Sequence, residues 1–262
     1  MVIGELGEGS PVALLHGFAQ TGECWWGVAE PLATKWRVLR VDLPGHGRSG
    51  PLPPDADQGS VARELLGDLE AAGAAGSALL GYSFGARIAL RAALEAPTPP
   101  SALVLVGATA GIRDAETRSE RLQRDRALAD RLETGGIKGF VGRWEANEVF
   151  ATQPPELVAR QRPVRLTQDP SGLATTLRRL GVAAAEPLWD RLAELAVPTL
   201  VVCGERDERY RHTARELAAA IPGAIEAVIE GAGHAAHLER PERFVELVTA
   251  FLDRVGEPAP DP

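Results

Sequence analysis

A serine between two glycines is the first pattern in this sequence that could carry chemistry. Gly81, Ser83 and Gly85 belong to a GxSxG pentapeptide that lies between an apolar run and a stretch of helical character. Glycines in this setting allow a sharp turn that exposes the serine hydroxyl at the start of a helix. The pentapeptide by itself is also explained by a turn whose serine caps the following helix.

Two residues far along the chain supply the partners that such a serine needs. Asp207 lies in the turn GERD and His234 lies in the loop GAGH, each just after an apolar, strand-like run. A serine becomes reactive when a histidine accepts its proton and a carboxylate orients that histidine. We therefore predict a catalytic triad of Ser83, Asp207 and His234, with Glu205 and His237 as weaker alternatives for the acid and the base. Taken singly, Asp207 could be a helix N-cap and His234 an ordinary loop residue.

Two backbone N–H groups complete the predicted chemistry. In the stretch LLHGFAQT, Phe18 follows a glycine at the end of a strand-like run, and Phe84 follows the serine directly. We predict that their N–H groups stabilise an oxyanion, which leaves both side chains free to shape the pocket. In the stretch DLPGHGRS, His46 is interpreted as a residue that fixes its own loop.

Arg87 and Tyr82 are predicted to contact the substrate. Arg87 follows Ser83 by four residues, so the two side chains share one face of a helix. A guanidinium on a packed helix is costly unless an anion meets it, so we predict that Arg87 binds a substrate carboxylate in bidentate fashion. The alternative is an arginine that extends to solvent and pairs with an acidic residue elsewhere. Tyr82 is predicted to place its hydroxyl in the pocket wall, or else to serve packing alone.

The elements that must position these residues follow from the alternation of apolar and helical stretches. Strands are predicted at 12–16, 37–43, 77–82, 101–107, 198–204 and 224–231, and helices at 22–34, 60–73, 84–95, 209–220 and 240–254. Near-continuous apolar strands suit a parallel sheet covered on both faces, which predicts an α/β fold with a mostly parallel, doubly wound sheet. The short stretch before the first of these strands predicts a short sheet edge.

The rhythm of strands and helices divides the chain into predicted parts. Residues 109–190 lack a convincing strand and are broken at Gly135–Gly136 and Pro154–Pro155, so we predict a helical cap there. The cap separates the two parts of the core, 1–108 and 191–256, and the proline-rich residues 257–262 are predicted to be a disordered tail.

Composition excludes several classes of protein and site. The chain has 262 residues, of which 45% are hydrophobic, a formal net charge of −8 and two cysteines. The acidity disfavours a nucleic-acid partner, and no targeting or membrane-spanning pattern is visible. Two isolated cysteines indicate neither disulfides nor a zinc site, and there is no nucleotide-binding or metal-binding spacing. We expect a cytoplasmic, cofactor-free and metal-free protein, monomeric or weakly homo-oligomeric, that acts on a small molecule.

The motifs LHGF, DLPGHGRS, GYSFG, GERD and GAGH together resemble those of the α/β-hydrolase superfamily. Further stretches, among them ER…DR at 120–126, W…VF at 144–150 and DPSGLATTLR at 169–178, resemble the 2-succinyl-6-hydroxy-2,4-cyclohexadiene-1-carboxylate synthase family of menaquinone biosynthesis. This resemblance covers nearly the whole chain. It implies a lyase whose triad abstracts a proton and eliminates pyruvate from 2-succinyl-5-enolpyruvyl-6-hydroxy-3-cyclohexene-1-carboxylate.

The same resemblance implies substrate-binding roles in the cap. Arg121 and Arg165 match the family's substrate arginines, and Trp144 matches its pocket tryptophan. By its own surroundings, Arg121 could equally belong to a solvated face, because residues 113–131 hold six arginines and five acidic residues. Ala86 departs from the family pattern, in which many relatives have a second glycine.

Two other functions stay open. A serine hydrolase of a small ester, thioester or carbon–carbon bond substrate would use the same triad. A noncatalytic scaffold that binds a small ligand or a partner protein would not use it at all.

Overall fold

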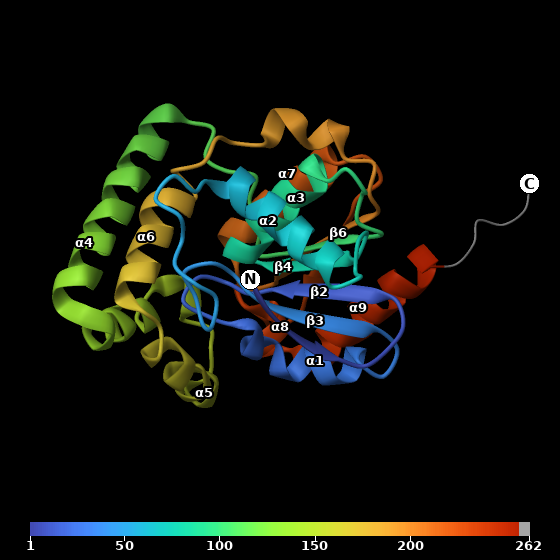
Figure 1. Ribbon diagram of the computed structural model, residues 1–262, viewed down its shortest axis with the longest axis horizontal. Helices are drawn as coiled ribbons and strands as arrows, with labels where there is room; N and C mark the ends of the chain where they lie inside the picture. The colour runs from blue at the N-terminus through green and yellow to red at the C-terminus, as the bar shows by residue number, and fades with distance from the viewer. Residues whose placement is uncertain (257–262) are drawn as a thin grey trace, which may run out of the picture.

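The computed structural model describes residues 1–256, and a seven-stranded sheet forms its centre (Figure 1). The strands lie in the order β1-β3-β2-β4-β5-β6-β7. Strand β1 runs antiparallel to β3, and all the other neighbouring pairs are parallel. The strands are β1 (Val2–Leu6), β2 (Pro11–Leu15), β3 (Arg37–Asp42), β4 (Ala78–Tyr82), β5 (Leu103–Val106), β6 (Thr199–Gly204) and β7 (Ile225–Ile229).

Helices cover both faces of this sheet. The core helices are α1 (Trp26–Leu32), α2 (Gln58–Ala71), α3 (Phe84–Glu95), α7 (Glu208–Ala220), α8 (Ala236–Glu239) and α9 (Pro241–Gly256), with 3-10 turns at Gly22–Trp25 and Trp189–Glu194. Helices α2, α3 and α7 lie on one face, and α1, α8 and α9 lie on the other. Along β2, Ala13 and Leu15 pack toward the first group while Val12 and Leu14 pack toward the second. Burial on both faces explains the continuous apolar strands and confirms the predicted fold class.

The sheet edge contains one strand that the apolar pattern did not predict. Strand β1 has the sequence VIGEL and pairs with β3 in a register that places Ile3 opposite Val41. Its residues are half-buried or exposed, since an edge strand contacts the core on one side only. The pattern therefore carries little apolar signal, and the edge is as short as expected.

Three helices gather beside the carboxyl ends of the strands, and we call them the cap helices (Figure 1). They are α4 (Ala115–Glu145), α5 (Pro155–Leu166) and α6 (Pro170–Leu180), with a 3-10 turn at Glu148–Phe150 between the first two. Helix α4 is kinked at Gly136, whose φ of 68° is not helical, and α5 begins at the second proline of the PP pair. The bounds 109–190 for a cap unit stay a prediction.

The cap helices have a small apolar core of their own. Leu132 and Phe140 of α4 pack against Leu173 and Leu177 of α6. Ala19, from the loop after β2, is buried in the same cluster, and Phe18 packs against it. The loop predicted to supply an oxyanion donor is thus embedded between core and cap.

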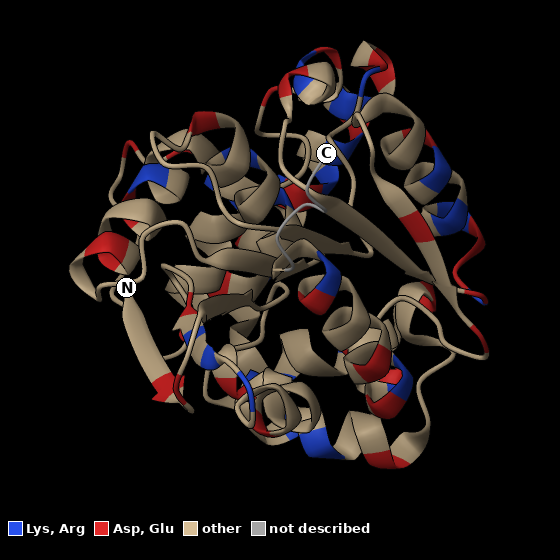
Figure 2. Cartoon of the chain, turned by 90° about the vertical axis from the view of Figure 1, so that its right-hand side faces the viewer, with Lys and Arg blue, Asp and Glu red and all other residues tan. Residues whose placement is uncertain are grey.

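The surface carries both signs of charge. Figure 2 shows Lys and Arg interspersed with Asp and Glu over the outer helices. Within residues 1–256, none of the helices has the length and apolar character that crossing a bilayer requires. The predicted tail, 257–262, lies outside the described residues.

Candidate active site

Ser83 stands at a sharp turn between β4 and α3. Its φ of 50° is unusual for a residue with a side chain and indicates a strained backbone. The turn brings chain segments so close that a Cβ on Gly81 would lie 2.5 Å from the Cα of Ala86, and a Cβ on Gly85 would lie 2.3 Å from the carbonyl oxygen of Leu15. The two glycines therefore make the turn possible.

The structure brings Ser83, His234 and Asp207 together. Ser83 Oγ lies 3.2 Å from His234 Nε2, and His234 Nδ1 lies 2.7 Å from Asp207 Oδ2. The second oxygen of Asp207 accepts the backbone N–H of Tyr210 at 3.3 Å, so this carboxylate is at once the N-cap of α7 and the partner of His234. The geometry is that of a nucleophile or base oriented by a histidine and a carboxylate.

The two rival residues are engaged elsewhere. Glu205 accepts the backbone N–H of Gly231 at 2.9 Å and is not hydrogen-bonded to His234. His237 is buried between the rings of Trp25 and Tyr82, at ring-centroid distances of 4.3 and 4.5 Å. Neither nitrogen of His237 has a hydrogen-bond partner in the described part of the chain.

Glu239 fixes the loop that carries His234. Its buried carboxylate accepts the N–H of Gly233 at 2.8 Å and the N–H of Ala235 at 3.2 Å, one on each side of the histidine. A carboxylate that joins the two flanking peptide groups restricts where His234 can lie.

We expect Glu239→Leu to lower the free energy of unfolding by about 2 kcal/mol or more, because two buried N–H groups lose their acceptor. Urea unfolding of this variant and of Glu242→Leu, an exposed position on α9, makes the comparison. Equal stability of the two variants would contradict the assigned role of Glu239.

The predicted oxyanion donors are both free of backbone partners. Among residues 1–256, neither the N–H of Phe18 nor that of Phe84, the first residue of α3, donates a hydrogen bond. His16 helps to hold the first of them in place: its Nδ1 donates to the carbonyl of Gly17 at 2.7 Å, while its Nε2 accepts the N–H of Leu43 at 2.9 Å. These partners require the neutral ring with the proton on Nδ1.

Three buried histidines should make the fold sensitive to acid. Burial lowers the pKa of His16 to about 4, that of His237 to about 3 and that of His46 well below its ordinary 6.5. Below pH 6.5 the unfolded chain binds protons at these positions that the folded chain does not, so their contribution to stability is complete above pH 6.5 and declines as the pH falls toward 4. We expect urea unfolding at pH 5 to show a loss on the order of 1–2 kcal/mol per histidine relative to pH 7.5.

The variant His237→Phe serves as the control for this effect. Phenylalanine fits the aromatic surroundings of position 237 and removes one of the three titrating groups. Its stability should therefore depend less steeply on pH between 6.5 and 4. A slope equal to that of the wild type would exclude His237 as a source of the acid sensitivity.

Arg87 is half-buried one helical turn from Ser83 and has no carboxylate partner among residues 1–256. One terminal nitrogen donates to the carbonyl of Leu180 at 3.2 Å, while the buried Nε has no partner among the residues that the structure describes. Burial, with a smaller contribution from the charge of Arg121, lowers the pKa of Arg87 to about 10. An anion at this position would offset the cost of burial.

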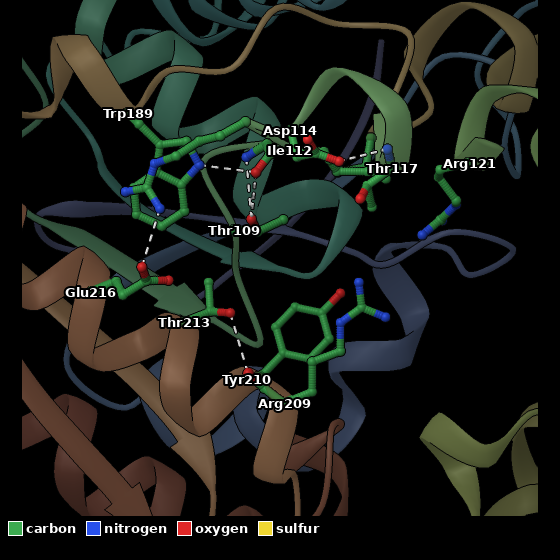
Figure 3. Close-up of a pocket in the computed structure, with 13 residues that line it drawn as sticks. Thr109, Ile112, Asp114, Thr117, Arg121, Trp189, Arg209, Tyr210, Thr213 and Glu216 are labelled. Atoms are coloured by element: carbon green, nitrogen blue, oxygen red, sulfur yellow. Dashed lines mark hydrogen bonds and ion pairs between the residues drawn. The ribbon is translucent and has the colours of Figure 1, made fainter. Parts of the chain in front are cut away.

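Arg121 lines a cavity of about 250 Å³ between α4 and α7 (Figure 3). Its Nε donates to Asp125 Oδ1 at 2.8 Å; Asp125 is buried, whereas the side chain of Arg121 is 36% exposed, so the pair joins a buried carboxylate to a partly exposed guanidinium. From the opposite side, α7 contributes Arg209 and Tyr210 to the cavity. Ser83 does not line this cavity, but the ring of Tyr210 packs on His234 at a centroid distance of 4.4 Å. The cavity therefore adjoins the group formed by Ser83, His234 and Asp207.

Arg165 lies in a different setting from the other two arginines. It is 1% exposed, and its terminal nitrogens donate to Glu145 Oε1 at 3.1 Å and to Gln161 Oε1 at 2.8 Å. Glu145 also pairs with Arg162. Both terminal nitrogens of Arg165 are thus engaged, and among the described residues its buried Nε has no partner.

A row of rings connects Arg87 with Arg165. The row consists, in order, of Phe84, His46, Phe18, Trp144 and Phe150. The centroids of successive rings lie 5.6, 5.5, 5.2 and 5.7 Å apart. The guanidinium of Arg87 lies 5.6 Å from the ring of Phe84, and that of Arg165 lies 5.5 Å from the ring of Phe150. The predicted pocket residues Phe18, Phe84 and Trp144 are thus parts of one aromatic surface.

Tyr82 lies behind this surface. Its ring is buried against His234, at a centroid distance of 5.3 Å, and against His237. Burial raises the pKa of Tyr82 well above its ordinary value, so its hydroxyl stays protonated.

Sequence reasoning did not identify Tyr210, Gln20 or Gln161. Tyr210 follows Asp207 by three residues and lies in the first turn of the helix that Asp207 caps. Because Asp207 was predicted to bind His234, this spacing could have indicated that Tyr210 lies near the same histidine. Gln20 and Gln161 are 141 residues apart, and a single sequence carries no signal for their contact.

Comparison with known proteins shows the family of the chain. Residues 12–247 match the model of a family described as alpha/beta hydrolase. A 2-succinyl-6-hydroxy-2,4-cyclohexadiene-1-carboxylate synthase of Escherichia coli O1:K1 is 35% identical over 247 residues, which cover 92% of this chain and 93% of that protein. The homologous enzyme of Salmonella typhimurium is 34% identical over 251 residues, with 93% and 94% covered.

Solved structures show the same relationship. MenH from S. aureus superposes with a TM-score of 0.93 at 30% identity, covering 97% of this chain and 99% of that one. A thermophilic esterase from Thermogutta terrifontis, with malate bound, superposes with a TM-score of 0.87 at 28% identity, covering 98% and 94%. The chain therefore belongs to the alpha/beta hydrolase family, and within it to the group of the 2-succinyl-6-hydroxy-2,4-cyclohexadiene-1-carboxylate synthases.

Proposed function

We propose that this enzyme is a lyase that eliminates pyruvate from 2-succinyl-5-enolpyruvyl-6-hydroxy-3-cyclohexene-1-carboxylate and gives 2-succinyl-6-hydroxy-2,4-cyclohexadiene-1-carboxylate. The proposal is supported by the synthases to which the chain is similar and by the residues around Ser83. In menaquinone biosynthesis, this step removes an enolpyruvyl group from a substrate that carries three carboxylates.

The chemistry begins at the ring carbon that bears the succinyl group. The hydrogen on this carbon is acidic, because the carbon adjoins both the succinyl ketone and the ring double bond. Ser83 Oγ removes this proton while His234 Nε2 accepts the proton of the serine, and Asp207 stabilises the charged histidine. The N–H groups of Phe18 and Phe84 stabilise the enolate oxygen that forms.

Elimination then completes the reaction. The released electron pair forms a double bond in the ring, the existing double bond moves by one position, and the C–O bond to the enolpyruvyl group breaks. The leaving group is the enolate of pyruvate. The methylene carbon of this enolate accepts a proton from His234, which gives pyruvate. All proton acceptors and oxyanion donors belong to the chain, so the proposed reaction needs no cofactor.

The arginines bind the anionic groups of the substrate in this proposal. Arg87 holds one carboxylate beside Ser83, and the two terminal nitrogens of Arg121 hold another at the adjoining cavity. Arg165 acts through its charge and through the guanidinium N–H groups that do not donate to Glu145 or Gln161. Trp144 forms a wall of the pocket, and Tyr82 supports it from behind by packing against His234 and His237. The protein is locally cationic at this site although its net charge is −8.

One observation supports the lyase proposal more strongly than the others. A half-buried guanidinium without a carboxylate partner among residues 1–256 lies one helical turn from the serine. A hydrolase of neutral esters would gain nothing from this costly arrangement, whereas an enzyme for a carboxylate-bearing substrate would use it.

The decisive test compares two reactions of the wild-type enzyme. Pyruvate release from the enzymatically generated substrate, corrected for spontaneous elimination, is measured beside hydrolysis of a short neutral aryl ester. We expect efficient elimination and poor ester hydrolysis. The reverse order would exclude the lyase proposal.

The reverse order would favour a serine hydrolase with the same three side chains. The likeness to the esterase from Thermogutta terrifontis supports this second candidate. In that case Ser83 Oγ attacks a carbonyl and forms an acyl-enzyme, which water then hydrolyses.

A further inference from the structure

The turn at residues 17–20, which supplies the Phe18 N–H, holds a conformation that its own sequence does not favour. Ala19 has a φ of 59°, in the left-handed region where residues with a side chain are uncommon. Such a backbone costs about 1–3 kcal/mol and persists only where the surrounding structure holds it. The turn therefore needs anchors.

One anchor lies inside the turn. Gln20 donates its backbone N–H to the carbonyl of Gly17 at 3.2 Å, and its side-chain Oε1 accepts the N–H of Gly17 at 3.1 Å. Together these two bonds close the turn around Phe18 and Ala19. The side chain of Gln20 must stay in place for the second bond to persist.

A second anchor comes from the cap helices. Gln20 Nε2 donates to Gln161 Oε1 of α5 at 3.0 Å. The same oxygen accepts a second hydrogen bond, from a terminal nitrogen of Arg165 at 2.8 Å. Arg165 is held in turn by Glu145 at the end of α4. Gln20, Gln161 and Arg165 are 3%, 0% and 1% exposed. Buried bonds of this kind are strong, because no water competes for the donors and acceptors.

We propose that Gln20 and Gln161 are positioning residues that couple the placement of the cap helices to the oxyanion turn. The cap helix α5 holds Gln161, Gln161 holds the side chain of Gln20, and Gln20 holds the N–H of Gly17 beside the donor of Phe18. When the cap helices are displaced, Gln20 loses its outer partner and the Phe18 N–H is no longer fixed toward the enolate oxygen. The catalytic part of this inference rests on the proposed function.

The test uses glutamine-to-methionine variants, which keep the shape of the side chain and remove its hydrogen bonds. Gln161→Met and Gln20→Met are compared with Gln168→Met. Gln168 is a matched control because it is 3% exposed and also links a residue beside the cap helices to a core N–H, that of Gly47 at 3.0 Å, but forms no hydrogen bond with residues 17–20 among the described residues.

We expect Gln161→Met and Gln20→Met to lower kcat for pyruvate release about 10- to 100-fold, with KM changed no more than about twofold. The kcat of the double variant should be no lower than that of the less active single variant, because both substitutions break the same chain of hydrogen bonds. Gln161→Glu keeps the acceptor for Gln20 and Arg165 and loses only the Nε2 bonds to Gln153 and Leu157, so it should recover most of the kcat that Gln161→Met loses. Gln168→Met should also keep its kcat.

Amide hydrogen exchange of the segment 16–20 gives a readout that does not depend on the reaction. Exchange should be about tenfold faster in Gln161→Met than in Gln168→Met at equal global stability. Equal exchange and equal kcat in these two variants, or a rise in KM alone, would overturn the inference. If the wild type releases no pyruvate, the proposed function is wrong, and the exchange comparison still decides whether the cap helices hold the turn.

Discussion

Ser83→Ala is expected to slow pyruvate release by about 10³-fold or more while the fold stays intact. The substitution removes the oxygen that lies 3.2 Å from His234 Nε2, and with it the group that takes the substrate proton. Alanine accepts the same backbone φ of 50° as serine, so the free energy of unfolding should change by less than about 1 kcal/mol. A coupled assay for pyruvate and urea unfolding measure the two quantities.

Ser171→Ala, at an exposed position of α6, is the control for this variant and should keep wild-type activity. His234→Ala and the double variant with Ser83→Ala should be as slow as Ser83→Ala alone, because the two residues act as one unit. If Ser83→Ala released pyruvate at the wild-type rate, Ser83 would have no part in the reaction. Absence of turnover in the wild type toward both the anionic substrate and the aryl ester would instead favour a noncatalytic scaffold.

Arg87→Met is expected to lower kcat/KM for the anionic substrate about 10- to 100-fold, mainly through KM. Methionine keeps much of the packing of α3 but cannot bind a carboxylate. Because Arg87 is half-buried and its Nε has no hydrogen-bond partner in the described part of the chain, its removal should leave the free energy of unfolding unchanged or raise it. Steady-state kinetics and urea unfolding of the same preparation test both parts.

Two variants serve as controls for Arg87→Met, one at position 87 itself and one at position 91, which lies one turn further along α3. Arg87→Lys keeps the charge without the bidentate geometry and should recover only part of the activity. Arg91 pairs with Glu95 at 3.1 Å, so Arg91→Met should affect stability more than activity. If Arg87→Met kept full activity on the anion and lost stability, Arg87 would be a packing residue and not a substrate ligand.

The fold could be predicted because it depends on patterns that repeat along the chain. Strands buried on both faces must be apolar throughout, and β2, β4, β5 and β6 show this character. The edge strands β1 and β7 are half-buried or exposed over most of their length, and β1, which has no apolar run, was not predicted. The two breaks expected in the cap helices, at Gly136 and Pro155, follow from the backbone limits of glycine and proline.

The residues around Ser83 were also predictable for a local reason. A nucleophile turn needs glycines at fixed spacing, and parallel strands bring the residues after β4, β6 and β7 to one edge of the sheet. Ser83, Asp207 and His234 meet within hydrogen-bonding distance for this reason. Their chain order and strand positions already contain the geometry.

The sequence by itself thus determined the sheet, the strained turn at Ser83 and the identity of the three side chains that meet there, because these follow from steric limits and short-range spacing. Only the tertiary structure decided how the polar groups of the cap helices are shared. Within residues 1–256 it leaves Arg87 without a carboxylate partner, pairs Arg165 with Glu145, and joins Gln20 to Gln161 across 141 residues. Hydrogen-bond partners of this kind depend on which surfaces pack together in three dimensions, and no spacing along the chain encodes them.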